Sequence, residues 1–314
     1  LHNDKVKISR IKLQHLPETV PMNREYLNFA QNQPNVMSDE KTLTVDLEKV
    51  IRDKNPALAR LLPRFVVAYL KRTIHQDEIN RILQAYSHLE PIPFIRAALA
   101  DMGIRYRAVG LEKLPREGRY LFASNHPFGG MDGMMLCDEL ERHFGSVKII
   151  VNDLLMHLTP LNPLFIPVNK HGRQKAQYAE LLRENLQSDV QVATFPAGLC
   201  SRRHRGVVRD CPWRPSFVKN AIESRRDVVP VYFEGELSSF FYNLSNFRTA
   251  VGIRANLEML YLPDEMFRQR GKDFRIRFGE PVPWQRLDDG KPAKVWAERL
   301  REYVYKLKNE QKNG

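Results

Sequence analysis

The stretch SNHPFGGMDG, at 124–133, holds the residue types that acid–base chemistry needs. His126 is a candidate general base, because an unperturbed imidazole titrates near neutral pH. Asp132 lies six residues later, where a carboxylate can fix the ring tautomer and stabilise the imidazolium. Two glycines, Gly129 and Gly130, permit a backbone tight enough to bring both side chains together. A purely structural interpretation also fits, in which Asp132 caps a helix and His126 bonds to the backbone.

Other sequence patterns that carry chemistry do not occur. The chain has no GxSxG, GxxxxGK[ST], GxGxxG or HExxH, so a serine nucleophile, P-loop hydrolysis, a dinucleotide cofactor and a zincin all lose support. The cysteines, Cys137, Cys200 and Cys211, form no CxxC pair, which indicates neither a disulfide framework nor a four-ligand zinc site. We therefore expect no metal, no bound cofactor and a reducing, cytoplasmic setting.

The elements that must position His126 change character along the chain. Residues 1–40 are polar and contain three prolines, which predicts a loosely ordered leader. Residues 41–100 carry apolar side chains at spacings of three and four, which predicts an N-terminal region of amphipathic helices. Residues 101–314 alternate short apolar runs with helical stretches, and we assign them to one α/β domain.

Within 101–314, strands separated by helices imply crossover connections. The predicted fold class is therefore α/β, a mostly parallel central sheet covered by helices on both faces. Strands are predicted at 119–124, 147–152, 163–168, 189–195, 227–233 and 273–279, and helices at 131–144, 173–187, 214–225 and 293–309. His126 follows the first of these strands, at the edge where open α/β sheets bind ligands.

The net charge of the chain indicates which classes of molecule it binds. The formal net charge is +12, and residues 201–226 hold eight Lys or Arg against Asp210 and Glu223. Either a solvated basic surface or an anion-binding role fits this run. An anionic membrane surface or an acidic carrier protein suits the charge. Nucleic acid is disfavoured, because only Trp213 and Phe217 interleave with the run. The richest apolar run, 58–70, contains a proline and two arginines and is too short to span a bilayer.

Four blocks in a fixed order resemble the glycerolipid acyltransferase family typified by bacterial 1-acylglycerol-3-phosphate acyltransferases. They are NHPFGGMD (125–132), LFIPVNK (164–170), FPAGLCS (195–201) and VVPVYF (228–233). The resemblance implies transfer of a fatty acyl group from a thioester of acyl carrier protein or coenzyme A to a lysolipid hydroxyl. It also implies that His126 is the base and Asp132 its orienting acid. The backbone amides near 195–199 or 129–130 are candidate donors to the oxyanion.

The sequence departs from the family pattern at several positions. Five residues separate His126 from Asp132 where the family usually has four, so one must bulge out. The second block ends in Lys170 where the family has Arg, and Ala197 and Cys200 replace the usual Glu and Arg of the third. Those positions are associated with the acyl acceptor, and the arginines at 202, 203 and 205 are candidates to rebuild an anion site. The predicted substrate-binding residues are Gly129, Gly130, Lys170, Phe195, Pro196, Gly198, Ser201, Arg202 and Arg203.

The residues within the blocks also indicate which lipid accepts the acyl group. HPFGGMDG and FPAGLCSR look most like the branch that acylates lyso-amino-acid lipids, the ornithine or glycine lipids of bacteria. A phosphatidate-forming enzyme and a non-catalytic protein that binds lipid or acyl carrier stay open as alternatives. We expect a peripheral protein on the inner face of the cell membrane, and the sequence leaves its oligomeric state open.

Overall fold

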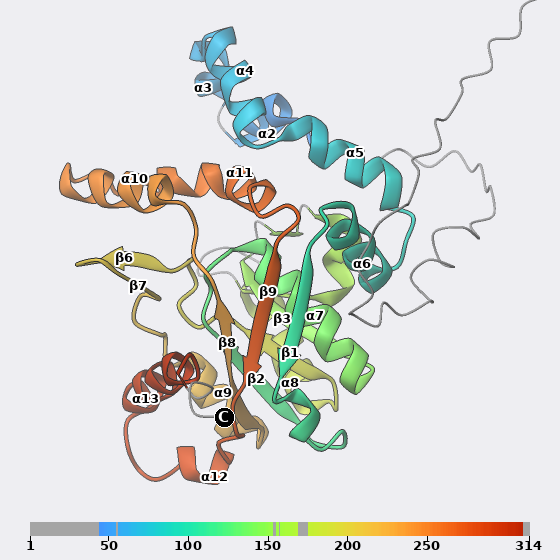
Figure 1. The fold of residues 1–314 in the computed structure, drawn as a ribbon, viewed down its shortest axis with the longest axis vertical. Coiled ribbons are helices and arrows are strands. Elements are labelled where there is room, and N and C mark those ends of the chain that lie inside the picture. The colour runs from blue at the N-terminus through green and yellow to red at the C-terminus, as the bar shows by residue number, and fades with distance from the viewer. Residues whose placement is uncertain (1–43, 55, 153–154, 157, 169–174, 310–314) are drawn as a thin grey trace, which may run out of the picture. The chain divides into compact units, whose positions relative to one another are not determined.

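The computed structural model describes residues 44–309 except 55, 153–154, 157 and 169–174 (Figure 1). The predicted leader, 1–40, lies outside the described residues. The described residues belong to one compact unit.

Helices follow one another between residues 47 and 101. They are α2 (Leu47–Lys54), α3 (Pro56–Leu61), α4 (Arg64–Thr73), α5 (Gln76–Tyr86) and α6 (Pro91–Asp101). Prolines set two boundaries: Pro63 precedes α4, and Pro91 occupies the first turn of α6, where its missing N–H costs no helical bond. Burial increases along the region, since α4 buries one residue and α6 buries five.

The central sheet has seven strands in the order β1-β9-β8-β2-β5-β3-β4. Five run parallel to one another, while β9 pairs antiparallel with β8 and parallel with β1. The fold class predicted from sequence, a mostly parallel α/β sheet, is therefore confirmed. The strands are β1 (Arg105–Val109), β2 (Tyr120–Ser124), β3 (Val147–Asn152), β4 (Phe165–Val168), β5 (Gln191–Thr194), β8 (Asp227–Glu234) and β9 (Asp273–Phe278).

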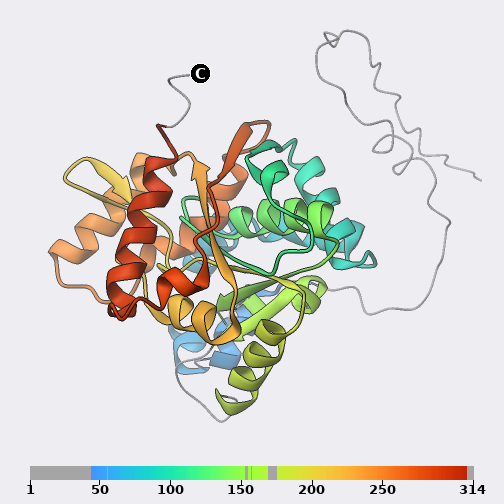
Figure 2. The same ribbon diagram turned by 90° about the horizontal axis from the view of Figure 1, so that it is seen from below.

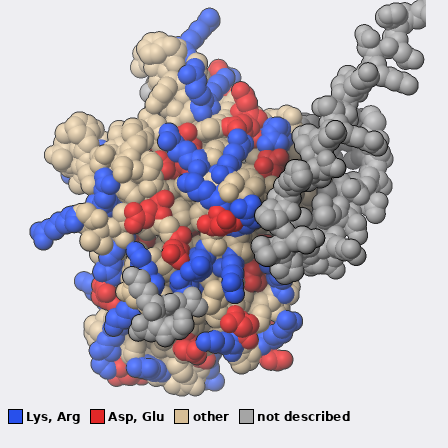
Figure 3. Space-filling view, viewed as in Figure 1, with Lys and Arg blue, Asp and Glu red and all other residues tan. Residues whose placement is uncertain are grey.

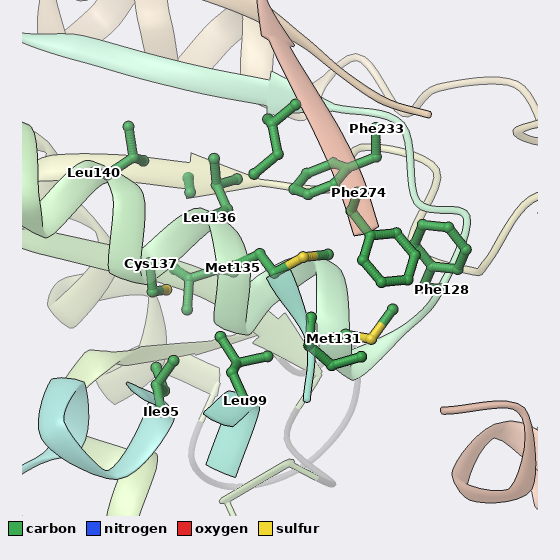
Figure 4. Close-up of a cluster of buried hydrophobic side chains, with 14 of the residues drawn as sticks. Ile95, Leu99, Phe128, Met131, Met135, Leu136, Cys137, Leu140, Phe233 and Phe274 are labelled. Carbon is green, nitrogen blue, oxygen red and sulfur yellow. The ribbon is translucent and has the colours of Figure 1, made fainter. Parts of the chain in front are cut away.

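Side-chain alternation along β2 divides the core between two faces. Tyr120 and Phe122 join the cluster packed under α6 and α7 (Gly130–Phe144), whereas Leu121 and Ala123 join the opposite cluster. Figure 2 shows these two layers of helices, and Figure 4 shows part of the first cluster. Helices α8 (Lys175–Gln187), α9 (Ser216–Ser224) and α13 (Ala293–Lys306) pack on the second face.

Some predicted boundaries differ from the structure. The strand expected at 163–168 begins at 165, because the proline-containing segment Thr159–Leu164 forms a 3-10 helix. The strand expected at 189–195 is limited to β5, and the last helix ends at Lys306.

Several elements were not predicted. β1 alternates charged and apolar residues at the sheet edge, where exposed arginines are tolerated on a short strand. The other unpredicted elements include the hairpin β6 (Arg202–His204) and β7 (Val207–Arg209), α10 (Ser239–Ala250), the 3-10 helix η4 (Leu257–Tyr261), α11 (Leu262–Phe267) and α12 (Trp284–Leu287).

Candidate active site

The site is built at the carboxyl edge of the parallel strands. β2 ends at Ser124, and Asn125 follows as a buried link to the next strand. Its side chain accepts a hydrogen bond from the Phe233 amide (2.7 Å) and donates one to the Phe233 carbonyl (3.0 Å). This pair of bonds fixes the chain to β8 just before His126.

The loop closes His126 onto Asp132. Nδ1 of His126 lies 2.9 Å from Oδ2 of Asp132, and the same oxygen accepts a hydrogen bond from the Phe128 amide (2.9 Å). Gly129, at φ +77°, makes the turn into α7, a conformation that residues with a Cβ rarely adopt. The five intervening residues are therefore accommodated, and Gly130 is the first residue of α7, with open space around its Cα.

Burial and hydrogen bonding act in opposite directions on Asp132. Its side chain is fully buried, which raises the pKa of the carboxyl group, while the hydrogen bonds from His126 and the Phe128 amide favour the ionised form. The N-terminus of α7 also favours negative charge at this position, the third residue of the helix. A carboxylate here accepts a hydrogen bond from Nδ1–H of His126, which leaves Nε2 as the acceptor nitrogen of the ring.

The imidazole ring of His126 is held in place by a contact on one ring face as well as by the hydrogen bond at Nδ1. Its ring stacks on Phe195, with centroids 4.0 Å apart and planes 20° from parallel. The side chain of His126 stays 18% exposed, so a substrate can reach it while the Asp132 carboxylate is sealed off. The neighbouring Phe128 packs edge-to-face on Phe274 of β9, which ties the loop to the core (Figure 4).

A second buried carboxylate, Asp210, holds the main chain at His126. Its Oδ1 accepts hydrogen bonds from the His126 amide (3.2 Å) and the Ser201 hydroxyl (2.6 Å), and Oδ2 accepts from Trp213 Nε1 (2.8 Å). The Ser201 amide in turn donates to the His126 carbonyl (2.8 Å). Asp210 was not among the site residues predicted from the sequence. The available signal was that Asp210 is one of only two acids in the basic run 201–226.

The third block wraps around these groups. Phe195 provides the stacking ring, and the Pro196 carbonyl accepts a hydrogen bond from the Arg214 amide (3.1 Å). Gly198 is left-handed at φ +67°, and its amide donates to the Phe195 carbonyl (2.9 Å), so this amide is committed to the turn. The structure thus brings Phe195 and Ser201 to His126. Lys170 lies outside the described residues.

Two arginines predicted to bind substrate are engaged within the protein. Arg202 is buried and pairs with the fully buried Glu258 at 2.8 Å, and Arg248 contacts the other Glu258 oxygen at 2.5 Å. Arg203 donates to Asn243 (2.5 Å) and lies over the Tyr242 ring (5.5 Å). No local pattern predicts the Glu258 contacts, because Arg202 and Arg248 lie 56 and 10 positions away from Glu258. The anion-binding role of Arg202 and Arg203 stays a prediction.

The described part of the chain lacks a metal cluster and a membrane-spanning helix. No group of three or more His, Cys, Asp or Glu side chains there is placed to hold a metal ion. None of the described helices is both long and apolar enough to cross a membrane.

Comparison with known proteins places the chain in a family. A family model described as acyltransferase matches residues 49–314. The chain belongs to this acyltransferase family. Two relatives carry the name lyso-glycine lipid O-acyltransferase. The one from Bacteroides thetaiotaomicron is 46% identical and covers 86% of this chain and 100% of its own length. The one from Phocaeicola vulgatus is 43% identical and covers 86% and 98%.

A solved structure with a lower likeness is the 1-acyl-sn-glycerophosphate (LPA) acyltransferase PlsC from Thermotoga maritima. It is 15% identical with a TM-score of 0.45, covering 78% of this chain and 89% of that one. The family match and the two relatives together identify this acyltransferase-family chain as an enzyme.

Proposed function

We propose that this enzyme is an O-acyltransferase that moves a fatty acyl group from a thioester to the hydroxyl of a lysolipid, with lyso-glycine lipid as the acceptor. The observation that carries the chemistry is the closed pair of His126 and Asp132, held beside a ring and a second carboxylate at the sheet edge. The names of two relatives above 40% identity support the acceptor.

His126 acts as the general base in this proposal. With Nδ1–H donated to Asp132, Nε2 takes the proton of the acceptor hydroxyl while that oxygen attacks the thioester carbonyl. The carbonyl π electrons move to oxygen and give a tetrahedral oxyanion. Collapse of this intermediate breaks the C–S bond, and the proton on Nε2 passes to the departing sulfur. The products are an ester and a free thiol, so the chain needs no covalent acyl-enzyme.

The oxyanion needs hydrogen-bond donors near His126. The first amides of a helix have no partner within the helix, and α7 begins at Gly130 directly after the loop. We assign the amides of Gly130 and Met131 to this role, in preference to the Gly198 amide, which already bonds to Phe195. The positive end of the α7 dipole supports the same developing charge.

The proposal also includes an acyl donor and a place in the cell for the enzyme. A thioester of acyl carrier protein or coenzyme A supplies the acyl group. The net charge of +12 attracts an acidic carrier and an anionic bilayer alike, with an encounter rate that falls as salt rises. The protein works as a peripheral protein at the inner face of the cell membrane, held by its amphipathic N-terminal helices.

The test is a reconstitution that varies donor and acceptor separately. Purified protein is mixed with palmitoyl-coenzyme A or palmitoyl-acyl carrier protein, and with lyso-glycine lipid, lyso-ornithine lipid or lysophosphatidate. Thiol release and mass spectrometry of the product report the reaction. We expect release that depends on the acceptor, with the lyso-glycine lipid fastest. Preference for lysophosphatidate would move the enzyme to the phosphatidate-forming branch, and no release with any pair would refute acyl transfer.

A further inference from the structure

Exposed apolar side chains gather in two segments that lie far apart in the sequence. Among the described residues, nine of the 14 large apolar side chains that are exposed belong either to α3–α4 or to the segment 239–261. Isolated exposed apolar residues are normal, but a gathering of this kind marks a surface that another body covers. The nine are Leu61, Phe65, Tyr69, Phe240, Phe247, Val251, Ile253, Leu257 and Leu260.

Side-chain contacts join the two segments into one surface. The hydroxyl of Tyr69 on α4 lies 2.7 Å from that of Tyr261, the last residue of η4. The Tyr261 ring packs edge-to-face on Phe240 of α10, with centroids 4.9 Å apart. Phe65 lies one helical turn before Tyr69, and Leu61 four residues before that. We call the nine residues together with Tyr261 the apolar face.

Basic residues outnumber acids in both segments of the apolar face, although Lys71 pairs with Glu48 just outside them. Residues 56–72 contain four Lys or Arg and no acid, and residues 239–261 contain Arg248, Arg254 and a single acid, Glu258. That acid is fully buried between two arginines and presents no charge to solvent. In Figure 3, the protrusions at the positions of α3–α4 and α10 are largely tan, with blue side chains beside them. Apolar side chains on segments with an excess of basic residues fit an anionic lipid surface.

The apolar face also leads to the catalytic loop. Leu262 follows Tyr261 directly, and its side chain reaches Gly129: a Cβ placed on that glycine would lie 3.5 Å from Leu262 Cδ1. The same glycine makes the turn between His126 and Asp132. The buried pair of Arg202 and Glu258 attaches η4 to β6, the strand that follows the third block. The apolar face therefore adjoins the loop that carries His126.

We propose that the segment 239–262, together with α3–α4, docks on an anionic bilayer and that the lysolipid acceptor passes along Leu262 to reach His126. This inference rests on the proposed function for its acceptor. The docking itself stands on the apolar face and its charge. It adds to the N-terminal helices a second membrane contact, one formed by the chain between β8 and β9.

The experiment measures binding to vesicles without donor or acceptor. Wild-type protein is sedimented with vesicles of phosphatidylcholine and phosphatidylglycerol, and with phosphatidylcholine alone. The double variant Phe247→Ser, Val251→Ser removes two exposed apolar side chains and is expected to lower the partition coefficient about tenfold. The matched control is Val295→Ser, which removes an exposed valine from α13, outside the apolar face. It should bind as the wild type does.

A second variant keeps the proposal falsifiable if the double variant unfolds. Arg254→Glu removes no apolar surface and should weaken binding to the anionic vesicles while leaving phosphatidylcholine binding unchanged. Equal losses in Val295→Ser, or full binding by the double variant, would overturn the docking. So would a wild-type dimer in gel filtration that the double variant converts to monomer without loss of vesicle binding. Vesicle binding with no acyl transfer by the wild type would instead refute the proposed function.

Discussion

The catalytic loop, 124–132, and the segment 239–262 lie in contact but differ in what they show to solvent. In the loop, Asn125, Phe128 and Asp132 are buried, and their polar groups bond to neighbouring strands and to one another. The segment instead buries its single acid, Glu258, and exposes several apolar side chains, such as Phe247. Reaction chemistry requires fixed groups, whereas a surface that gathers lipid requires exposed ones. Under the two proposals, the loop carries out the reaction and the segment contacts the lipid.

The largest expected effect is on the loop. His126→Ala removes the base and should lower kcat about 10²- to 10⁴-fold, because proton transfer in the transition state is lost. Thiol release at saturating acceptor measures it. His88→Ala, which removes an exposed histidine elsewhere in the chain, is the control and should keep full activity. Near-normal activity of His126→Ala would place the chemistry outside the loop.

The next effect tests the link between the two regions. Glu258→Gln leaves Arg202 and Arg248 buried without a carboxylate and should lower the free energy of unfolding by about 3 kcal/mol. Urea unfolding followed by tryptophan fluorescence measures the change. Glu302→Gln, which breaks a half-exposed pair with Arg209, should cost less than about 1 kcal/mol. Equal costs would mean that the buried cluster does not hold the segment to β6.

A smaller effect separates orientation from proton transfer. Asp132→Asn keeps the shape of the side chain but loses the charge that holds Nδ1–H, so kcat should fall about 10- to 100-fold. The loss should be smaller than that of His126→Ala, and KM should change little. Steady-state kinetics on both variants check the order. If Asp132→Asn matched the wild type, the contact between the two side chains would be structural only.

The smallest effect concerns the joint between the N-terminal helices and α11. Burial alone would lower the pKa of His75, but hydrogen bonds with Asp264 (3.0 Å) and Glu78 outweigh it and raise that pKa. Its stabilisation is therefore fully present below the unfolded pKa, about 6.5, and is lost as pH rises through the folded value.

The comparison with His75→Gln isolates this contribution. The wild type should exceed the variant in free energy of unfolding at about pH 6, and the difference should shrink by about pH 9. Urea unfolding at both pH values measures it. A difference that is constant with pH, or that grows as pH rises, would contradict a protonated His75 between two carboxylates.

Local sequence patterns were sufficient to predict the strands in the parallel part of the sheet. Strands β2, β3 and β8 and helix α7 appear where apolar runs, glycines and helical spacing placed them, since each element signals itself within ten or fifteen residues. β1 and the chain between β8 and β9 were missed. β1 is held by pairing with β9, which is 168 positions away, and no local pattern reports such pairing.

For the site, the sequence determined the residue types and their order: a histidine, two glycines and an aspartate after a strand, followed by three further blocks. Tertiary structure decided how they meet. The approach of His126 to Asp132 depends on a left-handed glycine that spacing alone does not fix. Asp210 reaches the His126 amide from 84 positions away, and Glu258 reaches Arg202 from 56. A carboxylate acquires its partners only when the chain packs, because burial makes an unpaired charge too costly to keep.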